Sequence, residues 1–194
     1  NCIYLDTGAM YRTVGLLAVR TNTDRHDDAA LAELLKNADI RVLRVDGSQH
    51  MALGGEDVET LIRTPEISMA ASDVASCPSV RRALVALQQK IAAGCDVVMD
   101  GRDIGTRVLP DADYKFFLTA SDKVRAQRRY DELKAKGESV TLQEVLEDVR
   151  RRDEQDTTRA ESPLTIADDA TEVETDDLGI DEVVTVLMAL MGRF

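Results

Sequence analysis

Two apolar segments of the sequence end in the same way, each running into an aspartate and a glycine. Residues 2–5 lead into Asp6-Thr7-Gly8, and residues 95–99 lead into Asp100-Gly101. Short apolar runs of this kind are typical of buried strands in a parallel sheet. Ligands of open α/β sheets bind beyond the carboxyl ends of such strands, so the ends of these two segments are the first places to examine for a ligand site.

Helical periodicity alternates with further short strands along the rest of the chain. Asp46-Gly47 is a hairpin signal, so residues 36–73 are predicted to form a small antiparallel insertion between helical segments. Strands alternating with helices indicate the α/β class with a largely parallel sheet. The predicted helices cover 9–19, 29–38, 78–93, 122–136, 141–156 and 181–191, and the further strands cover 40–45, 51–53, 114–118 and the residues around Val173. Three of these helices have predicted N-caps, at Asp27 or Asp28, Ser121 and Thr141.

The charge and composition of the chain exclude several classes of function. The formal net charge is −12, which argues against a nucleic-acid partner, and no apolar run approaches the ~20 residues of a membrane span. Three cysteines and two histidines argue against a disulfide framework, a zinc site and a Ser–His–Asp hydrolase, and they favour the reducing cytoplasm. The 18 arginines against six lysines favour a small anionic ligand, with surface ion pairs as the alternative.

The segment at 100–106 carries the strongest chemical pattern. Gly101 and Gly105 allow a close approach of the backbone to a ligand. Arg102 supplies a fork of donors that suits phosphate, and Asp103 supplies an acceptor that suits the exocyclic amine of a base. A glycine turn with a local Arg102–Asp103 ion pair is the alternative.

The segment at 6–12 also follows a strand and opens a helix. Backbone N–H groups at a helix N-terminus point toward any ligand bound there, and Arg12 lies one turn into this helix. The spacing alone favours an ordinary helix cap with a solvated Arg12 over a ligand site.

A third polar segment, 150–159, places Arg152, Asp156 and Arg159 at positions i, i+4 and i+7, which indicates one helical face. A carboxylate between two guanidiniums can bind ribose hydroxyls while the guanidiniums bind phosphate. An exposed ladder of ion pairs worth ~0.5 kcal/mol each is the alternative. Gly137 separates this helix from an upstream helix with a similar cluster, which suits a mobile lid. That upstream cluster is Arg125, Arg128 and Arg129.

Taken in order, these segments resemble bacterial cytidylate kinase over essentially the whole chain. The stretches that carry the resemblance are LDTGAMYR, LGGEDVETLIRTPEIS, ASCPSVRRALVALQ, VVMDGRDIGTRVLPDADYKFFL and RRRDEQDTTRAESPL. The resemblance implies an α/β nucleoside monophosphate kinase core of the P-loop NTPase type, with a parallel sheet, over 1–35 and 74–194. It also implies a lid at about 122–160 and a small inserted α+β monophosphate-binding domain over 36–73.

The resemblance also assigns a role to each polar segment. Ser72, Arg81 and Asp103 would read the cytosine ring, and a buried acceptor left without the exocyclic amine costs ~1–3 kcal/mol, which favours cytosine over uracil. Thr7 would contact substrate where the family commonly has serine, so the hydroxyl is kept. Asp156 would bind the ribose, with Arg152 close by. The implied catalytic residues are those at the α-phosphate, Arg12, Arg102 and Arg159, together with Arg129. The implied ATP lid contains Arg125, Arg128 and Arg129.

The implied reaction is in-line transfer of the γ-phosphoryl group of ATP to the phosphate of CMP or dCMP, with Mg²⁺ bridging the β- and γ-phosphates. The acceptor phosphate is already ionised near neutral pH, so no general base is needed. The expected protein is a monomer without nucleic-acid or membrane partners. A kinase acting on UMP, AMP or a small metabolite, and a non-catalytic nucleotide-binding module, are the alternatives.

A Walker-type Gly-x-x-x-x-Gly-Lys-Ser/Thr loop belongs to the implied fold, and none of the six lysines follows a glycine. The resemblance therefore implies that the first strand, the loop and the first helix are missing, which would expose a sheet edge. We expect the 194-residue chain to be a marginally folded and weak or inactive kinase, and the whole gene product to be active. An ATP-dependent CMP assay of the purified chain tests this expectation. Turnover near that of a complete kinase would refute it.

Overall fold

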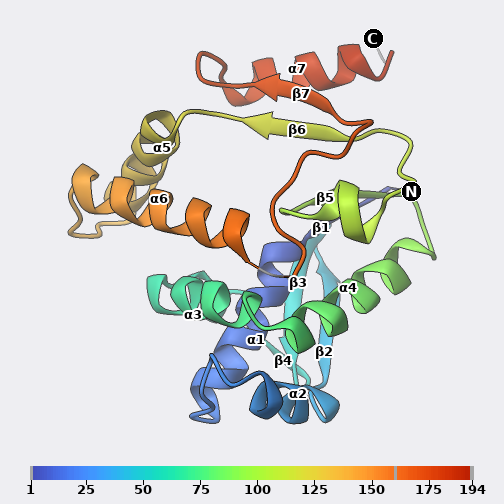
Figure 1. The fold of residues 1–194 in the computed structure, drawn as a ribbon, viewed down its shortest axis with the longest axis vertical. Coiled ribbons are helices and arrows are strands. Elements are labelled where there is room, and N and C mark those ends of the chain that lie inside the picture. The colour runs from blue at the N-terminus through green and yellow to red at the C-terminus, as the bar shows by residue number, and fades with distance from the viewer. Residues whose placement is uncertain (1, 160, 193–194) are drawn as a thin grey trace. The chain divides into compact units, whose positions relative to one another are not determined.

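The computed structural model divides the chain into two compact units, drawn in Figure 1. The first unit consists of Asn1–Leu109 and Arg159–Pro163, and the second consists of Pro110–Thr158 and Leu164–Phe194. Each unit combines helices with a two-stranded parallel sheet, which confirms the predicted α/β class. The structure describes residues 2–159 and 161–192.

The parallel sheet of the first unit joins the two segments that end in aspartate and glycine. Strand β1 (Ile3–Asp6) pairs with β5 (Val97–Asp100) in a register that sets Leu5 opposite Met99. Leu5 is fully buried and Met99 packs against the same core cluster. The predicted strands at 2–5 and 95–99 and their parallel pairing are therefore confirmed.

The expectation that the strand at 95–99 is buried is wrong for one face of this sheet. Tyr4 and Val98 lie opposite each other in the register and are 56% and 58% exposed. Side chains alternate between the two faces of a strand, and only the face with Leu5 packs on the core.

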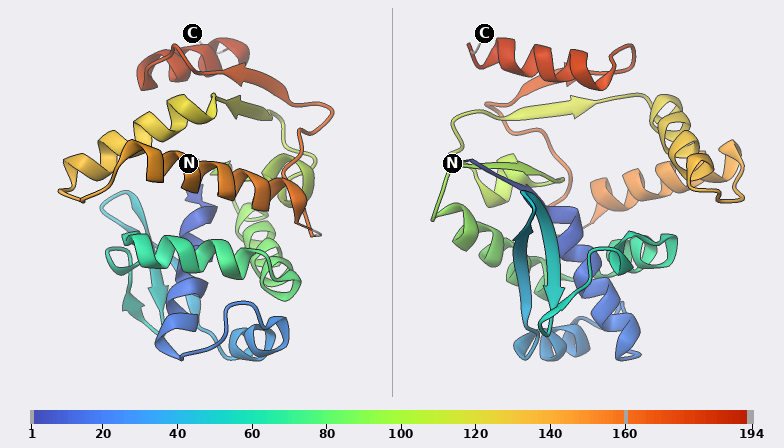
Figure 2. Two further views of the ribbon diagram at one scale, coloured as in Figure 1. Left: turned by 60° about the vertical axis from the view of Figure 1, so that its left-hand side comes forward. Right: turned by 180° about the vertical axis from the view of Figure 1, so that it is seen from behind.

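Helix α1 (Thr7–Arg20) forms the centre of the first unit. The Asp6 carboxylate caps its N-terminus by accepting a 2.9 Å hydrogen bond from the backbone N–H of Ala9. Met10 and Val14 are fully buried, and each such side chain contributes about 1.5–3 kcal/mol of burial free energy. The helix contacts α3, α4 and β3, as Figure 2 shows from two sides.

The predicted antiparallel pairing is confirmed as a three-stranded sheet within the first unit, while the assignment of 36–73 as an insertion stays a prediction. Strand β2 (Ile40–Val45) pairs with β3 (Ser48–Leu53), which pairs with β4 (Glu56–Asp57). Asp46 and Gly47 connect the first two strands with φ angles of 50° and 83°. Positive φ at both central residues is the geometry of a type I′ turn, which the Asp-Gly pair favours. A short 3₁₀ helix, η1 (Leu61–Arg63), follows the sheet.

Three further helices surround α1, and two of them were predicted. The Asp27 side chain caps α2, as expected, and Pro78 occupies the first turn of α4. The third helix was not predicted, although Thr64 accepts a hydrogen bond from Ile67 N and Pro65 follows it, which is a helix-start pattern. Their bounds are α2 (Asp28–Lys36), α3 (Pro65–Ala75) and α4 (Pro78–Ala92).

The second unit is built on the parallel pair β6 (Phe116–Thr119) and β7 (Thr171–Glu174). Ser121 and Thr141 cap the two helices between these strands, as the sequence predicts. None of the helices in the described ranges is both long and apolar enough to cross a membrane. The helices of this unit are α5 (Asp122–Ala135), α6 (Leu142–Thr158) and α7 (Ile180–Leu190).

Gly15 sets how closely α1 and α3 approach. A Cβ atom at this position would lie 3.0 Å from the backbone nitrogen of Ala71 and 3.1 Å from the carbonyl carbon of Ala70. We predict that Gly15→Ala lowers the free energy of unfolding by about 1–2 kcal/mol, because the overpacking outweighs the gain in helix propensity. Urea denaturation measures this change.

Gly94→Ala is the matched control. Its Cβ would meet only the carbonyl oxygen of Ile91 at 3.6 Å, an ordinary contact, so we expect a change within about 0.5 kcal/mol. Equal effects of the two substitutions would contradict the close approach of α1 and α3.

Candidate functional site

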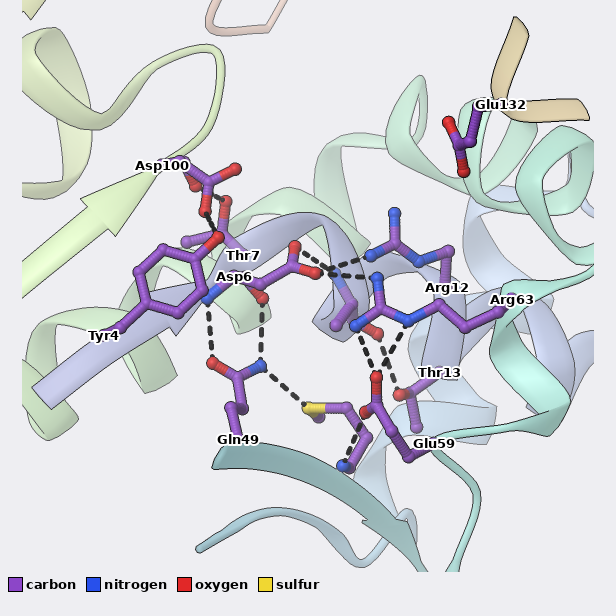
Figure 3. Close-up of polar contacts among 12 residues, drawn as sticks. Tyr4, Asp6, Thr7, Arg12, Thr13, Gln49, Glu59, Arg63, Asp100 and Glu132 are labelled. Atoms are coloured by element: carbon purple, nitrogen blue, oxygen red, sulfur yellow. Dashed lines mark hydrogen bonds and ion pairs between the residues drawn. The ribbon is translucent and has the colours of Figure 1, made fainter. Parts of the chain in front are cut away.

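The two polar segments predicted to bind a ligand meet at the carboxyl ends of β1 and β5. Asp6 lies opposite Asp100 in the sheet register. The buried Thr7 hydroxyl donates a 2.7 Å hydrogen bond to the carbonyl oxygen of Asp100. A Cβ atom on Gly101 would lie 2.5 Å from the oxygen of that hydroxyl. Glycine is therefore required for the close approach of the two segments, shown in part in Figure 3.

Tyr4 and Asp100 form a second contact at this edge. The Tyr4 hydroxyl donates a 2.8 Å hydrogen bond to Oδ1 of Asp100. Partial burial raises the pKa of the Asp100 carboxyl above its ordinary value, while the hydrogen bond from Tyr4 lowers it. Partial burial, together with the hydrogen bond and the charge of Asp100, raises the pKa of the Tyr4 hydroxyl.

Asp103 is paired with Arg81 of α4 in the interior. Their side chains form a short hydrogen-bonded ion pair, and the two residues are only 5% and 2% exposed. Arg81 also donates a 3.2 Å hydrogen bond to the carbonyl oxygen of Ala75, and its guanidinium lies 5.4 Å from the ring centroid of Tyr11. Arg102, the neighbour considered as a local partner of Asp103, is exposed.

A buried ion pair of this kind carries a large desolvation cost, and it requires good geometry and further hydrogen bonds. Within the described residues, the Nε of Arg81 is buried and has no hydrogen-bond partner. Ser72 lies half-buried on α3, and we find no hydrogen bond of its hydroxyl to protein atoms in the part of the chain that the structure describes. Both side chains thus retain hydrogen-bonding capacity.

Arg12 is held at the N-terminus of α1. Its Nη2 donates a 2.7 Å hydrogen bond to Oδ2 of Asp6. A Cβ atom on Gly8 would lie 3.1 Å from Arg12 Nη1 and from Asp6 Oδ1, so this glycine leaves room for both side chains. Arg63 reaches the same carboxylate oxygen at 2.9 Å. It lies within the resembling stretch LGGEDVETLIRTPEIS but was not predicted as a site residue.

The arginines of α5 are bound within the second unit. Arg125 forms two hydrogen bonds of 2.8 and 2.7 Å with the carboxylate of Asp153 on α6. Arg129 pairs with Glu132 at 2.7 Å. Arg128 donates to the carbonyl oxygens of Thr175 and Leu178, which follow β7. The helix pair turns at Gly137, whose φ of 80° favours glycine.

The predicted helical face of Arg152, Asp156 and Arg159 is wrong at its end, because α6 stops at Thr158. The hydroxyl of Thr158 donates to the carbonyl oxygen of Glu154, within the last turn of the helix. Arg159 then donates from Nε to the carbonyl oxygen of Ser162 at 2.7 Å, in the segment that belongs to the first unit. Arg152 pairs with Asp148 at 3.1 Å.

The described residues contain no group of three or more His, Cys, Asp or Glu side chains that is able to hold a metal ion. Guanidiniums from α1, α4 and the loop after β5 suit an anionic ligand, and the buried carboxylate of Asp103 suits a donor group on the same ligand.

Comparison with known proteins gives one family. A family model described as Cytidylate kinase matches residues 1–193. The cytidylate kinase of Caldicellulosiruptor bescii is 47% identical over 191 residues, which cover 98% of this chain and 84% of the relative. That of Caldanaerobacter subterraneus subsp. tengcongensis is 51% identical over 181 residues, 93% of this chain and 79% of the relative. That of Bacillus subtilis is 47% identical over 181 residues, 93% and 81% of the two chains.

We predict that Tyr4→Phe raises the pKa of the Asp100 carboxyl further. The substitution keeps the ring but removes the hydrogen bond that stabilises the carboxylate form. Titration of the Asp100 side-chain carbon by NMR measures the change. Tyr114→Phe, at a half-exposed tyrosine, is the control and should leave the titration unchanged. A lower or unaltered pKa in Tyr4→Phe would contradict this account.

Proposed function

Because the chain belongs to the cytidylate kinase family, we propose that it is a phosphotransferase that moves the γ-phosphoryl group of ATP to CMP or dCMP, giving CDP or dCDP. The structural observation that carries the proposal for this chain's own residues is the buried Arg81–Asp103 pair. It fixes an acceptor and a donor beside the segment where the two parallel strands end, which is where a ligand of an open α/β sheet binds.

In the proposal, Asp103, Arg81 and Ser72 read the base. Asp103 accepts a hydrogen bond from the exocyclic amine of cytosine, a group that uracil lacks. The unpartnered Nε of Arg81 and the Ser72 hydroxyl are available to the ring. Because Asp103 is buried and held by Arg81, it cannot turn away from a ligand that offers no donor, so uracil leaves it with an unsatisfied hydrogen-bonding position.

Arg12, Arg102 and Arg159 bind the acceptor phosphate in the proposal, with Thr7 close by. A guanidinium offers a planar fork of donors that matches phosphate oxygens. Arg12 lies at a helix N-terminus, where backbone N–H groups and the helix dipole also favour an anion. The proposal assigns 36–73, with its antiparallel sheet, as the inserted monophosphate-binding domain between core segments 1–35 and 74–194.

The α5–α6 helix pair is assigned as the lid, at about 122–160. Asp156 binds the ribose in the proposal, with Arg152 beside it, and the triphosphate is bound by the α5 cluster of Arg125, Arg128 and Arg129. Arg125 and Arg129 are half-exposed and already bound to carboxylates. Binding of ATP then exchanges a carboxylate partner for a phosphate oxygen, which needs side-chain rotation and no new charge.

Phosphoryl transfer of this kind needs position and positive charge more than covalent chemistry. The guanidiniums align the acceptor oxygen with the γ-phosphorus and offset the charge of the phosphoryl group in flight. Mg²⁺ would be held chiefly by phosphate oxygens of the nucleotide and by water, as this ion commonly is. When bound, the ion neutralises charge on the triphosphate.

We predict that Asp103→Asn reduces the preference for CMP over UMP by at least about tenfold. The amide offers a donor to the uracil carbonyl as well as an acceptor to the cytosine amine, so the energetic penalty for uracil falls. Asparagine keeps the size of the side chain and a hydrogen bond to Arg81. The ratio of kcat/KM for the two substrates, measured with the whole gene product, gives the preference.

Ser72→Ala and Ser68→Ala complete the experiment. In the proposal the Ser72 hydroxyl also accepts from the exocyclic amine, so its loss should raise KM for CMP several-fold and lower the CMP/UMP ratio, by less than Asp103→Asn does. Ser68 lies one turn earlier on the same helix, and among the described residues its hydroxyl donates to the carbonyl oxygen of Thr64, so Ser68→Ala should change neither value. An unaltered CMP/UMP ratio in Asp103→Asn, with the fold intact, would overturn the assignment of Asp103.

A further inference from the structure

Four charged side chains of the first unit form an alternating row that ends at Arg12. Arg63 donates from Nε to Oε1 of Glu59 at 2.8 Å and from Nη1 to Oδ2 of Asp6 at 2.9 Å. Arg12 donates to the same Asp6 oxygen at 2.7 Å. Figure 3 shows both guanidiniums facing the Asp6 carboxylate, so the signs run negative, positive, negative, positive from Glu59 to Arg12.

The Glu59 end of the row is fixed to the antiparallel sheet. Oε2 of Glu59 accepts a 3.2 Å hydrogen bond from the backbone nitrogen of Met51 on β3. The side chains of Glu59 and Asp6 are only 16% and 15% exposed. Water therefore screens these charges weakly, and each charge influences its neighbours more strongly than in a surface pair.

The guanidinium of Arg12, at the other end of the row, has hydrogen-bond donors that the described residues do not use. The side chain of Arg12 is mostly sheltered, at 21% exposure. Its Nε is buried and has no hydrogen-bond partner among the described residues. Only Nη2 is committed to Asp6, whereas Arg63 uses all three of its nitrogens on Asp6 and Glu59. Arg12 is thus the member of the row that can accept an anionic ligand.

We propose that Asp6 and Arg63 are positioning residues for the acceptor phosphate: Asp6 orients the Arg12 guanidinium, and Arg63 offsets the Asp6 charge that would otherwise repel a phosphate dianion. This inference rests on the proposed function, in which Arg12 binds the phosphate of CMP. Without Arg63, the negative charge of Asp6 would orient Arg12 but would also cancel its positive charge. With Arg63 present, the Asp6 charge is shared between two guanidiniums, so the phosphate encounters a positive charge at Arg12.

A purely structural reading of the same contacts makes a different prediction. Arg63 could simply tie η1 and the antiparallel sheet to α1. Arg20 makes a comparable tie at the other end of α1, through hydrogen bonds of 2.6 and 3.0 Å to Glu56 of β4. If Arg63 only links these elements, then removing either partner of the Arg63–Glu59 pair should change the CMP affinity in the same direction. Loss of Arg20 should then also have an effect similar to that of the loss of Arg63.

The test compares Arg63→Gln with Glu59→Gln, because both remove the same Arg63–Glu59 ion pair but change the charge of the row in opposite directions. Affinities for CMP and for cytidine, which lacks the phosphate, are measured by calorimetry on the 194-residue chain. We expect Arg63→Gln to weaken CMP binding about fivefold to tenfold and Glu59→Gln to strengthen it a few-fold, the size expected of one charge acting in a partly solvated site.

The cytidine affinity should stay within about twofold in both variants. Both differences in CMP affinity should shrink as salt is raised from about 50 to about 500 mM, because salt screens the effect of a single charge. Arg63→Lys keeps the charge and should restore most of the loss, while Arg20→Gln should change neither affinity. Weaker CMP binding in both glutamine variants, a parallel loss of cytidine binding, or an equal loss in Arg20→Gln would overturn the inference.

The proposed function is judged by a separate measurement, ATP-dependent phosphorylation of CMP by the whole gene product without substitutions. Failure of that reaction counts against the function. The direction of the two affinity changes decides the roles of Asp6 and Arg63, because binding of CMP and cytidine is measured without ATP.

Discussion

Asp6 lies where β1 ends and α1 begins, and the local structure of the first unit depends on its contacts. One carboxylate oxygen caps α1 and the other holds Arg12 and Arg63. Its backbone N–H and carbonyl bond to the side-chain amide of Gln49 on β3 at 2.8 and 3.2 Å. A single residue thus joins the parallel sheet, the central helix and the antiparallel sheet, so a shift of any of these elements changes the position of Arg12.

The buried Arg81–Asp103 pair imposes a different constraint, on specificity rather than on assembly. Removing one partner of such a pair leaves an uncompensated charge and costs about 3–5 kcal/mol, while replacing both with apolar groups is often neutral. Stability alone therefore gives little reason to keep an ion pair here. A fixed acceptor beside the ends of β1 and β5 gives a chemical reason, because it can distinguish ligands by one hydrogen-bond donor.

The sequence predicts what depends on neighbouring residues and misses what depends on distant ones. The start of α1, the Asp27 cap and the Asp46-Gly47 turn follow from local chemistry and are confirmed. The partner of Asp103 is 22 residues away and the contact between Asp6 and Arg63 spans 57 residues, so spacing gave neither. Helix α3 was missed although Thr64 and Pro65 mark its start.

The exposed faces and the end of α6 are harder still to predict. Val98 has the composition of a buried strand, and its exposure follows from which face of the sheet packs on the core, which no local pattern encodes. Helix α6 ends at Thr158, one residue before Arg159. Helical spacing alone does not fix where a helix ends, so it could not show that Arg159 lies just beyond the last turn.

The surplus of acidic residues explains how so many guanidiniums are kept in a folded chain without repelling one another. Arg12, Arg125, Arg129 and Arg152 each lie against a carboxylate. In the proposed function, a phosphate ligand would therefore meet arginines that carboxylates already orient. Arginine suits this arrangement better than lysine, since its planar fork can hold a carboxylate with one edge and a phosphate with another.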